Sequence, residues 1–116
     1  MPPDCLFCKI VAGEVPSTAV LDRGSIYAFR DIAPAAPVHI LIVPKEHIDD
    51  VRALEPQHGG VLVEMIKAAN EIAGAEGTGE SGYRLIFNIG PDAGQTIFHL
   101  HLHLVGGKPL GAMAPR

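Results

Sequence analysis

Residues 98–107, FHLHLHLVGG, alternate three histidines with three leucines, and this period of two is typical of a β-strand. Successive side chains of a strand point to opposite faces of its sheet, so the leucines are expected to point into a core. His99, His101 and His103 then line the other face, about 6–7 Å apart. The chain is thereby constrained to build a sheet with one apolar face and a row of imidazoles on the other.

The remaining segments predict an α+β domain in which a long helix covers one side of a five-stranded antiparallel sheet. A short helical turn is expected within residues 6–16. Pro56 suits the first turn of the long helix, and apolar residues follow at helical spacing to Ala73. Strands are expected over 18–32 (a hairpin turning at Asp22-Arg23-Gly24), 38–44, 83–90 and 98–107.

Composition narrows the class of protein. The chain has 116 residues, of which 47% are hydrophobic and 19% charged, as expected for one compact domain. Its net charge is −4 and its nine lysines and arginines are spread singly, which argues against nucleic acid and anionic membrane as partners. No apolar run reaches the roughly 18–20 residues of a membrane span. The N-terminus lacks the pattern of a secretion signal, so we expect a cytoplasmic protein with reduced cysteines.

The histidine row has several possible uses. It could be a polar outer face, or it could bind metal through two neighbouring members, since the outer two lie roughly 13 Å apart. The preceding loop, NIGPDAGQT (88–96), is either a hairpin turn or a glycine-rich anion site. Because this loop runs directly into the histidines, it favours a phosphate seated over imidazoles. A neutral imidazole is a competent nucleophile at pH 7.

These motifs resemble those of the histidine triad family of nucleotide hydrolases and transferases. HLHLHLV follows N-x-G-x-x-x-G-Q-T in the family's order, and residues 29–47, FRDIAPAAPVHILIVPKEH, are similar to its nucleoside-binding half. The pair Gly106-Gly107 is similar to the Hint branch. The resemblance spans Cys5 to Gly107, within one domain of five parts: 1–16, 17–50, 51–76, 83–107 and a short tail, 108–116.

The resemblance implies a role for each member of the triad. His101 would be the nucleophile that attacks the α-phosphorus of a nucleoside 5′-phosphate derivative. The backbone of His99 would accept a hydrogen bond from the other nitrogen of that ring. His103 would contact the phosphate oxygens, and His39 would support the triad from the neighbouring strand.

The resemblance also implies the substrate contacts. Phe29 and Ile32 would line the base pocket, and Asp31 would accept hydrogen bonds from the ribose hydroxyls. Asp31 could equally be a strand-end residue that opens the proline-rich loop. The phosphate cradle would be completed by residues of the glycine-rich loop: Asn88, Gly94, Gln95 and Thr96.

The implied reaction has two steps, formation of a nucleotidyl-histidine and its hydrolysis, and requires no metal. Purine nucleoside phosphoramidates are the substrates that the Hint branch favours. Three other functions stay open from the sequence: hydrolysis of dinucleoside polyphosphates, slow or regulatory nucleotide binding, and storage or sensing of metal by the histidines.

The cysteines form a CxxC motif, Cys5 and Cys8, which is either a redox pair or half of a zinc site. Some histidine triad proteins carry a Cys-Cys-His-His zinc, and by resemblance His47 and His99 would complete a structural site here. His58 fits no motif and is expected to be solvent-exposed.

The chain departs from the Hint branch at its end. That branch has a tryptophan-containing tail, whereas this chain has no tryptophan and ends in KPLGAMAPR. The leaving-group side of the pocket is therefore expected to differ. The resemblance further implies a homodimer, with the 56–73 helix and an edge strand at the interface and the two sheets joined into one of ten strands.

Overall fold

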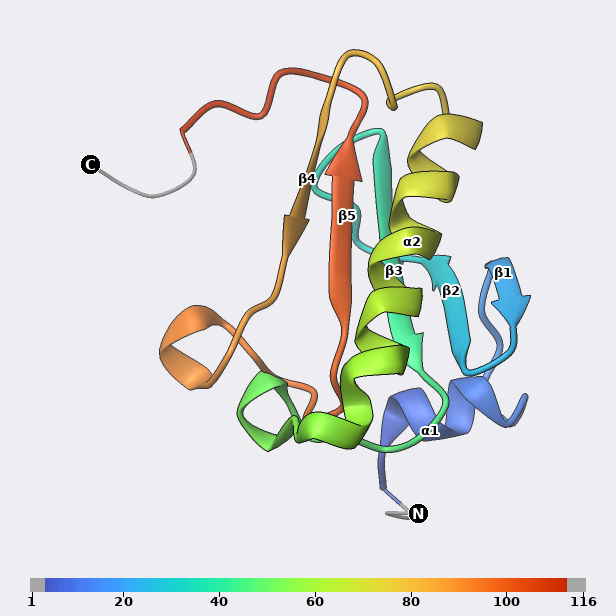
Figure 1. Ribbon diagram of the computed structural model, residues 1–116. Coiled ribbons are helices and arrows are strands. Elements are labelled where there is room, and N and C mark those ends of the chain that lie inside the picture. The colour runs from blue at the N-terminus through green and yellow to red at the C-terminus, as the bar shows by residue number, and fades with distance from the viewer. Residues whose placement is uncertain (1–3, 113–116) are drawn as a thin grey trace.

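The computed structural model describes residues 4–112 and confirms the α+β class (Figure 1). A five-stranded antiparallel sheet packs against one long helix, α2. Three short 3-10 turns, at Val51–Ala53, Pro56–His58 and Pro91–Ala93, lie in the connections. The helices and strands are, in chain order, α1 (Leu6–Val11), β1 (Ala19–Arg23), β2 (Ile26–Arg30), β3 (Val38–Pro44), α2 (Gly59–Ala75), β4 (Tyr83–Ile86) and β5 (Leu102–Gly106).

The strands lie in the order β1-β2-β3-β5-β4, so the histidine-bearing β5 sits inside the sheet between β3 and β4. The predicted strand 38–44 matches β3. The hairpin before it turns at Gly24-Ser25, one residue later than predicted, because Arg23 pairs with Ile26. Gly24 has φ +56°, a left-handed conformation that glycine adopts without strain.

The last two strands are shorter than predicted, since residues 87–101 leave the ladder. The β3–β5 pairing ends at Ile42 and Leu102, and β3 itself ends at Pro44, which has no N–H to donate. His99 and His101 therefore precede β5, and His103 is the one triad histidine within it. His99 and His101 lie outside the strand, and the ring of His99 faces the cysteines, so the three imidazoles do not form the even row that the alternation predicts.

The main core lies between α2 and the leucine face of the sheet. The buried side chains of the helix meet the buried residues of β3 and β5, and Leu100 packs with them as predicted. The helix begins at Gly59, after the 3-10 turn at Pro56–His58. The prediction that His58 is solvent-exposed is wrong: its Nδ1 accepts from the Glu55 N–H at 2.9 Å, and its side chain is only 13% exposed. A histidine here closes the turn that starts the helix.

A second apolar cluster lies on the histidine face, so the sheet is not covered on one side alone. The short helix α1 packs there against Phe29, Leu41 and Val43. It contributes four buried side chains to the cluster: Cys5, the residue before the helix, and Phe7, Cys8 and Ile10 within it. This end of the histidine face is therefore closed by the N-terminal segment.

In the glycine pair after β5, steric constraints require the second residue, Gly107, to be glycine. This residue has φ +91°, and a Cβ there would lie 3.0 Å from the Cβ of Pro37. Both the backbone conformation and the close approach require glycine. Within the described residues, no helix has the length and apolar character needed to cross a membrane.

Candidate active site

The ring of His101 is held by the backbone of His99. The Nδ1 of His101 lies 2.8 Å from the His99 carbonyl oxygen, which can only accept, so Nδ1 carries the proton. The lone pair of a neutral ring is then on Nε2. Burial lowers the pKa of His101, so the neutral form is favoured. The Phe7 ring packs edge-on against His101 at a centroid distance of 5.1 Å and excludes water from one side.

His103 is oriented by a chain of hydrogen bonds through His39. The Ala35 N–H donates to His39 Nδ1 at 3.0 Å, so a neutral His39 carries its proton on Nε2. That nitrogen lies 2.9 Å from His103 Nδ1 and 3.4 Å from a carboxylate oxygen of Asp31. Because His103 accepts through Nδ1, its own proton is on Nε2. Burial, with the neighbouring His101 and His39, lowers the pKa of His103 to about 4.

An apolar cavity of about 240 Å³ opens above His101 and His103. Phe29 and Ile32, predicted to line a base pocket, are both among its lining residues; Phe29 is buried, whereas Ile32 is 99% exposed. The sequence reasoning missed the other apolar walls: Leu6, Phe7, Ile10, Leu41 and Ile97. Nothing in the local sequence of α1 indicates that the helix docks over the histidine face.

Asp31 has both positions that the sequence left open, at the end of a strand and at the wall of the cavity. One carboxylate oxygen accepts from the Ala33 N–H at 2.8 Å, as a strand-end aspartate does. The residue also lines the cavity, and its other oxygen faces His39. The turn contact therefore fixes the carboxylate at the cavity wall.

The glycine-rich loop supplies three residues to the cavity, Asn88, Gly94 and Thr96. Gly94 has φ +89°, which suits a tight turn of backbone beside the site. The Asn88 amide nitrogen lies 3.5 Å from His103 Nε2. The prediction that Gln95 contacts substrate does not fit its position, because its amide is bonded to backbone groups of Gly90, Asp49 and Ile97.

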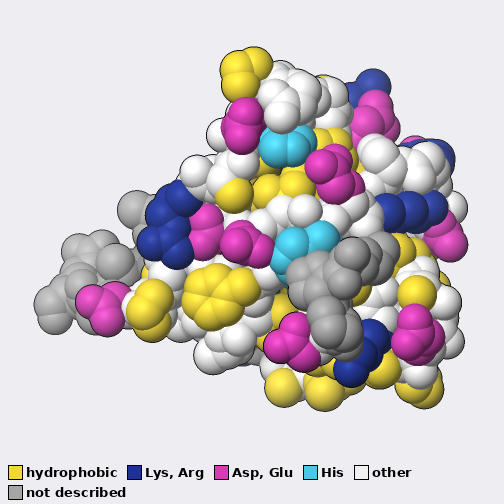
Figure 2. All heavy atoms as spheres, turned by 90° about the horizontal axis from the view of Figure 1, so that it is seen from below, with side chains coloured by type: hydrophobic (Ala, Val, Ile, Leu, Met, Phe, Trp, Pro, Cys, Tyr) yellow, Lys and Arg dark blue, Asp and Glu magenta, His cyan; other side chains and the backbone are white. Residues whose placement is uncertain are grey.

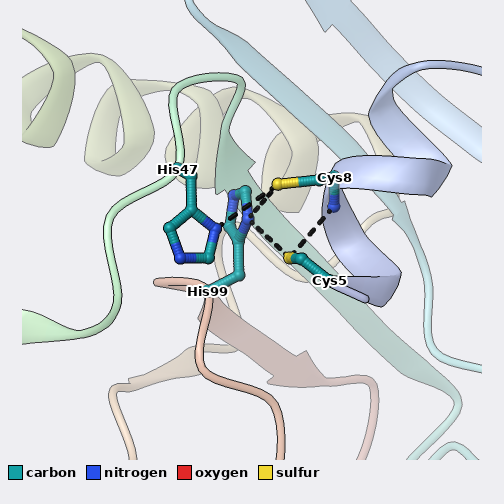
Figure 3. A group of neighbouring side chains, drawn as sticks. All are labelled: Cys5, Cys8, His47 and His99. Atoms are coloured by element: carbon teal, nitrogen blue, oxygen red, sulfur yellow. Dashed lines mark hydrogen bonds between the residues drawn. The ribbon is translucent and has the colours of Figure 1, made fainter. Parts of the chain in front are cut away.

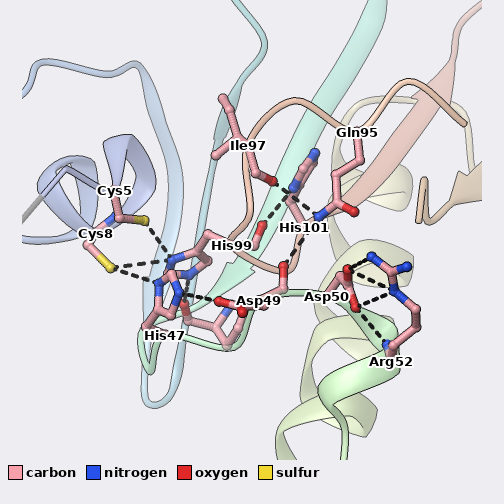
Figure 4. Close-up of polar contacts among 11 residues, drawn as sticks. Cys5, Cys8, His47, Asp49, Asp50, Arg52, Gln95, Ile97, His99 and His101 are labelled. Carbon is pink, nitrogen blue, oxygen red and sulfur yellow. Dashed lines mark hydrogen bonds and ion pairs between the residues drawn. The ribbon is translucent and has the colours of Figure 1, made fainter. Parts of the chain in front are cut away.

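The Gln95 side chain is buried and braces the loop from within. Its Oε1 accepts from the Gly90 N–H at 2.7 Å, and its Nε2 lies 3.3 Å from the carbonyl oxygens of Asp49 and Ile97. All these partners are backbone groups. Gln95 therefore sets the shape of the loop instead of facing the cavity (Figure 4).

A second cluster brings together Cys5, Cys8, His47 and His99 (Figure 3). The thiols come from α1 and the residue before it, and they point toward imidazoles from the segment after β3 and the segment before β5. Three sulfur–Nδ1 separations are 3.4 Å: Cys5 and Cys8 to His99, and Cys8 to His47. Tetrahedral zinc with ordinary bond lengths requires about 3.5 Å between sulfur and nitrogen ligands. The donor set and its spacing therefore fit zinc.

The outer nitrogens of both imidazoles have acceptors that fix their tautomers. His47 Nε2 lies 2.7 Å from a carboxylate oxygen of Asp49, and His99 Nε2 lies 2.8 Å from the Pro44 carbonyl oxygen (Figure 4). Their Nδ1 lone pairs consequently face the thiols, as is usual for a metal-binding histidine whose other ring nitrogen donates to a carboxylate or carbonyl oxygen. Burial, and then contact with Cys5, raises the pKa of the Cys8 thiol to about 11. A bound cation would reverse that shift.

Figure 2 shows the end of the molecule near α1, where histidine side chains reach the surface between hydrophobic and acidic ones. His99 is not among the exposed residues, since it is completely buried. The structure thus gives His99 two contacts at once: its ring faces the cysteines and its carbonyl oxygen holds His101.

Comparison with known proteins places this geometry in a family. Residues 4–112 match the family model described as scavenger mRNA decapping enzyme C-term binding. The chain is 45% identical over 113 residues to a purine nucleoside phosphoramidase of Escherichia coli (strain K12), covering 97% of this chain and 95% of that one. It is 38% identical over 109 residues to a 14 kDa zinc-binding protein of Brassica juncea, covering 92% and 96%. A HIT family hydrolase from Clostridium thermocellum has a similar structure, with TM-score 0.93, 48% identity and 97% of each chain covered.

Proposed function

The chain belongs to the histidine triad family of hydrolases, and from that premise we propose that it hydrolyses purine nucleoside phosphoramidates through a nucleotidyl-histidine. One observation carries the proposal: the His99 carbonyl oxygen holds the Nδ1 proton of His101, which leaves the Nε2 lone pair available beside the cavity. The identity to a phosphoramidase over nearly the whole chain supports this substrate class.

In the first step, His101 Nε2 attacks the α-phosphorus and the bond from phosphorus to the amine nitrogen breaks. The amine nitrogen takes a proton from solvent as it leaves, and the nucleotidyl group stays on His101. Water then attacks phosphorus and returns a proton to solvent, the bond to Nε2 breaks, and the nucleoside monophosphate is released. Covalent catalysis of this kind replaces one difficult displacement with two easier ones.

His103 would stabilise the phosphoryl oxygens during both steps. Its Nε2 carries the proton and lies 3.5 Å from the Asn88 amide nitrogen, so two donors lie side by side. An anionic oxygen between them could accept from both, and such donors act most strongly where negative charge develops. His39 would keep the His103 proton on the correct nitrogen.

The nucleoside would occupy the apolar cavity. Phe7 and Phe29, whose ring centroids lie 5.4 Å apart, give it aromatic walls suited to a purine. Asp31 would accept hydrogen bonds from the ribose hydroxyls, since its carboxylate is an acceptor with two oxygens.

The proposal is tested with adenosine 5′-phosphoramidate, following AMP by chromatography. Wild-type protein should release AMP, and His101→Ala should release none above background. His58→Ala is the matched control, because His58 lies outside the cavity and should leave turnover near that of the wild type. Absence of AMP from the wild type would contradict the proposed substrate, and dinucleoside polyphosphates would then be tried as substrates for the same histidine.

We further propose that Cys5, Cys8, His47 and His99 hold a structural zinc ion. A closed four-ligand site takes no part in the reaction and would fix α1 to the sheet. Elemental analysis of protein purified without added metal should give one zinc per chain, and Cys5→Ser/Cys8→Ser protein should contain none. A metal content unchanged by the double substitution would contradict the site.

A further inference from the structure

A second cavity, of about 430 Å³, adjoins His103 on the β4 side of the site. It shares Asn88 and His103 with the apolar cavity, so the two cavities meet where the phosphoryl group would bind. Its other walls come from β3, β4, β5 and the segment after β5.

Strand register places Arg84 on the histidine face, beside this cavity. His39 pairs with Val105 across β3 and β5, and Val105 pairs with Arg84 across β5 and β4. Directly paired residues of neighbouring strands share a face of the sheet, so Arg84 lies on the same face as His39. Lys108, which follows β5, also lines the cavity.

Arg84 differs from the other three arginines within residues 4–112. Arg23, Arg30 and Arg52 each contact a carboxylate at 2.6–2.8 Å. The Arg84 guanidinium instead donates to the Gly111 carbonyl oxygen at 2.9 Å, and among the described residues it has no ion-pair partner. Because this acceptor is neutral, the positive charge of Arg84 is not compensated, and the hydrogen bond fixes the position of the guanidinium.

No aspartate or glutamate is among the described residues that line this cavity, whereas Arg84 and Lys108 both do. The cavity therefore carries net positive charge. The nucleoside cavity differs, because it is largely apolar, has Asp31 at its wall, and contains one arginine, Arg30, whose charge is compensated by Glu76. An anionic group is therefore attracted to the cavity lined by Arg84 and Lys108 and is repelled by the carboxylate of Asp31 in the nucleoside cavity.

We infer that the Arg84 cavity binds the leaving group and selects one that carries a carboxylate, such as an amino acid joined through its nitrogen to the nucleoside 5′-phosphate. This inference rests on the proposed function. In the reaction, the bond from phosphorus to nitrogen breaks, water supplies the hydroxyl of the nucleoside monophosphate, and the amino acid leaves as a free amine with its carboxylate unchanged. Arg84 pairs with that carboxylate through charge-assisted hydrogen bonds.

The test uses two substrates that differ in one charge: the adenosine 5′-phosphoramidates of glycine and of glycinamide. For the wild type, kcat/KM should be about tenfold higher or more for the glycine compound, as expected for one charge-assisted contact. Arg84→Met should bring the ratio close to one, Arg84→Lys should keep part of the preference, and Lys108→Met should lower the ratio by less. Arg23→Met is the matched control, since Arg23 lies outside this cavity and should keep the wild-type ratio.

The binding of the two compounds can be measured without catalysis, and this tests the role of Arg84 separately from the proposed reaction. His101→Ala protein should bind the glycine compound about tenfold more tightly than the glycinamide compound by calorimetry, and the added substitution Arg84→Met should abolish the difference. A binding difference without turnover by the wild type would support the charged cavity and overturn the proposed reaction. Turnover of both compounds at equal kcat/KM, or a ratio that Arg84→Met leaves intact, would overturn the inference.

Discussion

At the scale of single residues, the site depends on which ring nitrogen carries each proton. Backbone groups determine this for two of the histidines. The His99 carbonyl oxygen keeps the proton of His101 on Nδ1, and the Ala35 N–H keeps the proton of a neutral His39 on Nε2. Backbone groups do not ionise, so this assignment persists across the working pH range. His103 depends on a side chain, His39, and is the member most open to disturbance.

Substituting His39 should therefore impair catalysis without touching the nucleophile. In His39→Ala, His103 Nδ1 loses its donor, and the ring can place its proton on the wrong nitrogen. We expect kcat to fall roughly tenfold to a hundredfold, as for other residues that orient an active group, with a smaller change in KM. Steady-state kinetics with adenosine 5′-phosphoramidate measure both. Wild-type kcat in His39→Ala would show that His103 needs no such support.

The low pKa of His103 should also appear in the stability of the protein. Unfolded histidine takes up a proton near pH 6.5, whereas folded His103, which faces His39, His101 and Asp31, does so only near pH 4. Between these values the unfolded state binds more protons, so stability present above pH 6.5 is lost as pH falls toward 4. The loss from this residue is at most about 3 kcal/mol.

Urea unfolding at a series of pH values measures this loss. His103→Asn removes the titrating ring, so its free energy of unfolding should decline less steeply between pH 6.5 and pH 4 than that of the wild type. Equal slopes for the two proteins would contradict the assignment of a low pKa to His103.

At the scale of elements, regular strands were predictable and departures from them were not. The apolar run at 38–44 matches β3 because a strand buried on both faces is nearly continuous in hydrophobicity. The alternation at 98–107 placed the leucines in the core, but β5 begins only at Leu102, because its pairing with β3 stops at Ile42 although β3 continues to Pro44. The CxxC and histidine motifs indicated the candidate residues, yet the docking of α1 on the histidine face depends on long-range packing.

The docking of α1 connects the proposed zinc site to the active site. Cys8 and Phe7 are adjacent in α1, and Phe7 packs on His101. Loss of zinc should free the helix, lower the melting temperature and reduce turnover. The stabilisation by zinc is about 2.7 kcal/mol when free zinc is a hundredfold above its dissociation constant.

Thermal unfolding of the wild type with and without a chelator measures this effect. Chelation should lower the melting temperature, and restored zinc should reverse the change. Cys8→Ser should unfold at the temperature of the chelated wild type and should not respond to zinc. A Cys8→Ser protein as stable as the untreated wild type would contradict the structural role of the cluster.

At the scale of the whole molecule, the sheet has two edges, β1 and β4, and the long helix exposes one large apolar side chain. Val63 on α2 is 55% exposed, although the rest of the exposed helix surface is largely polar. An unpaired edge strand is a template for pairing with another chain. The family resemblance implies that two copies use an edge strand and the long helix, α2, for this purpose, which would also cover Val63.

We therefore expect a homodimer in solution, with a mass of two chains by light scattering coupled to size-exclusion chromatography. Val63→Glu should shift the protein toward the monomer, because burying a charge at an apolar interface is costly. Val63→Ile keeps the side chain apolar and should leave the dimer intact, so it separates charge from a general effect of substitution at this position. A monomeric wild type would contradict the dimer, and a dimeric Val63→Glu would place the interface elsewhere on the molecule.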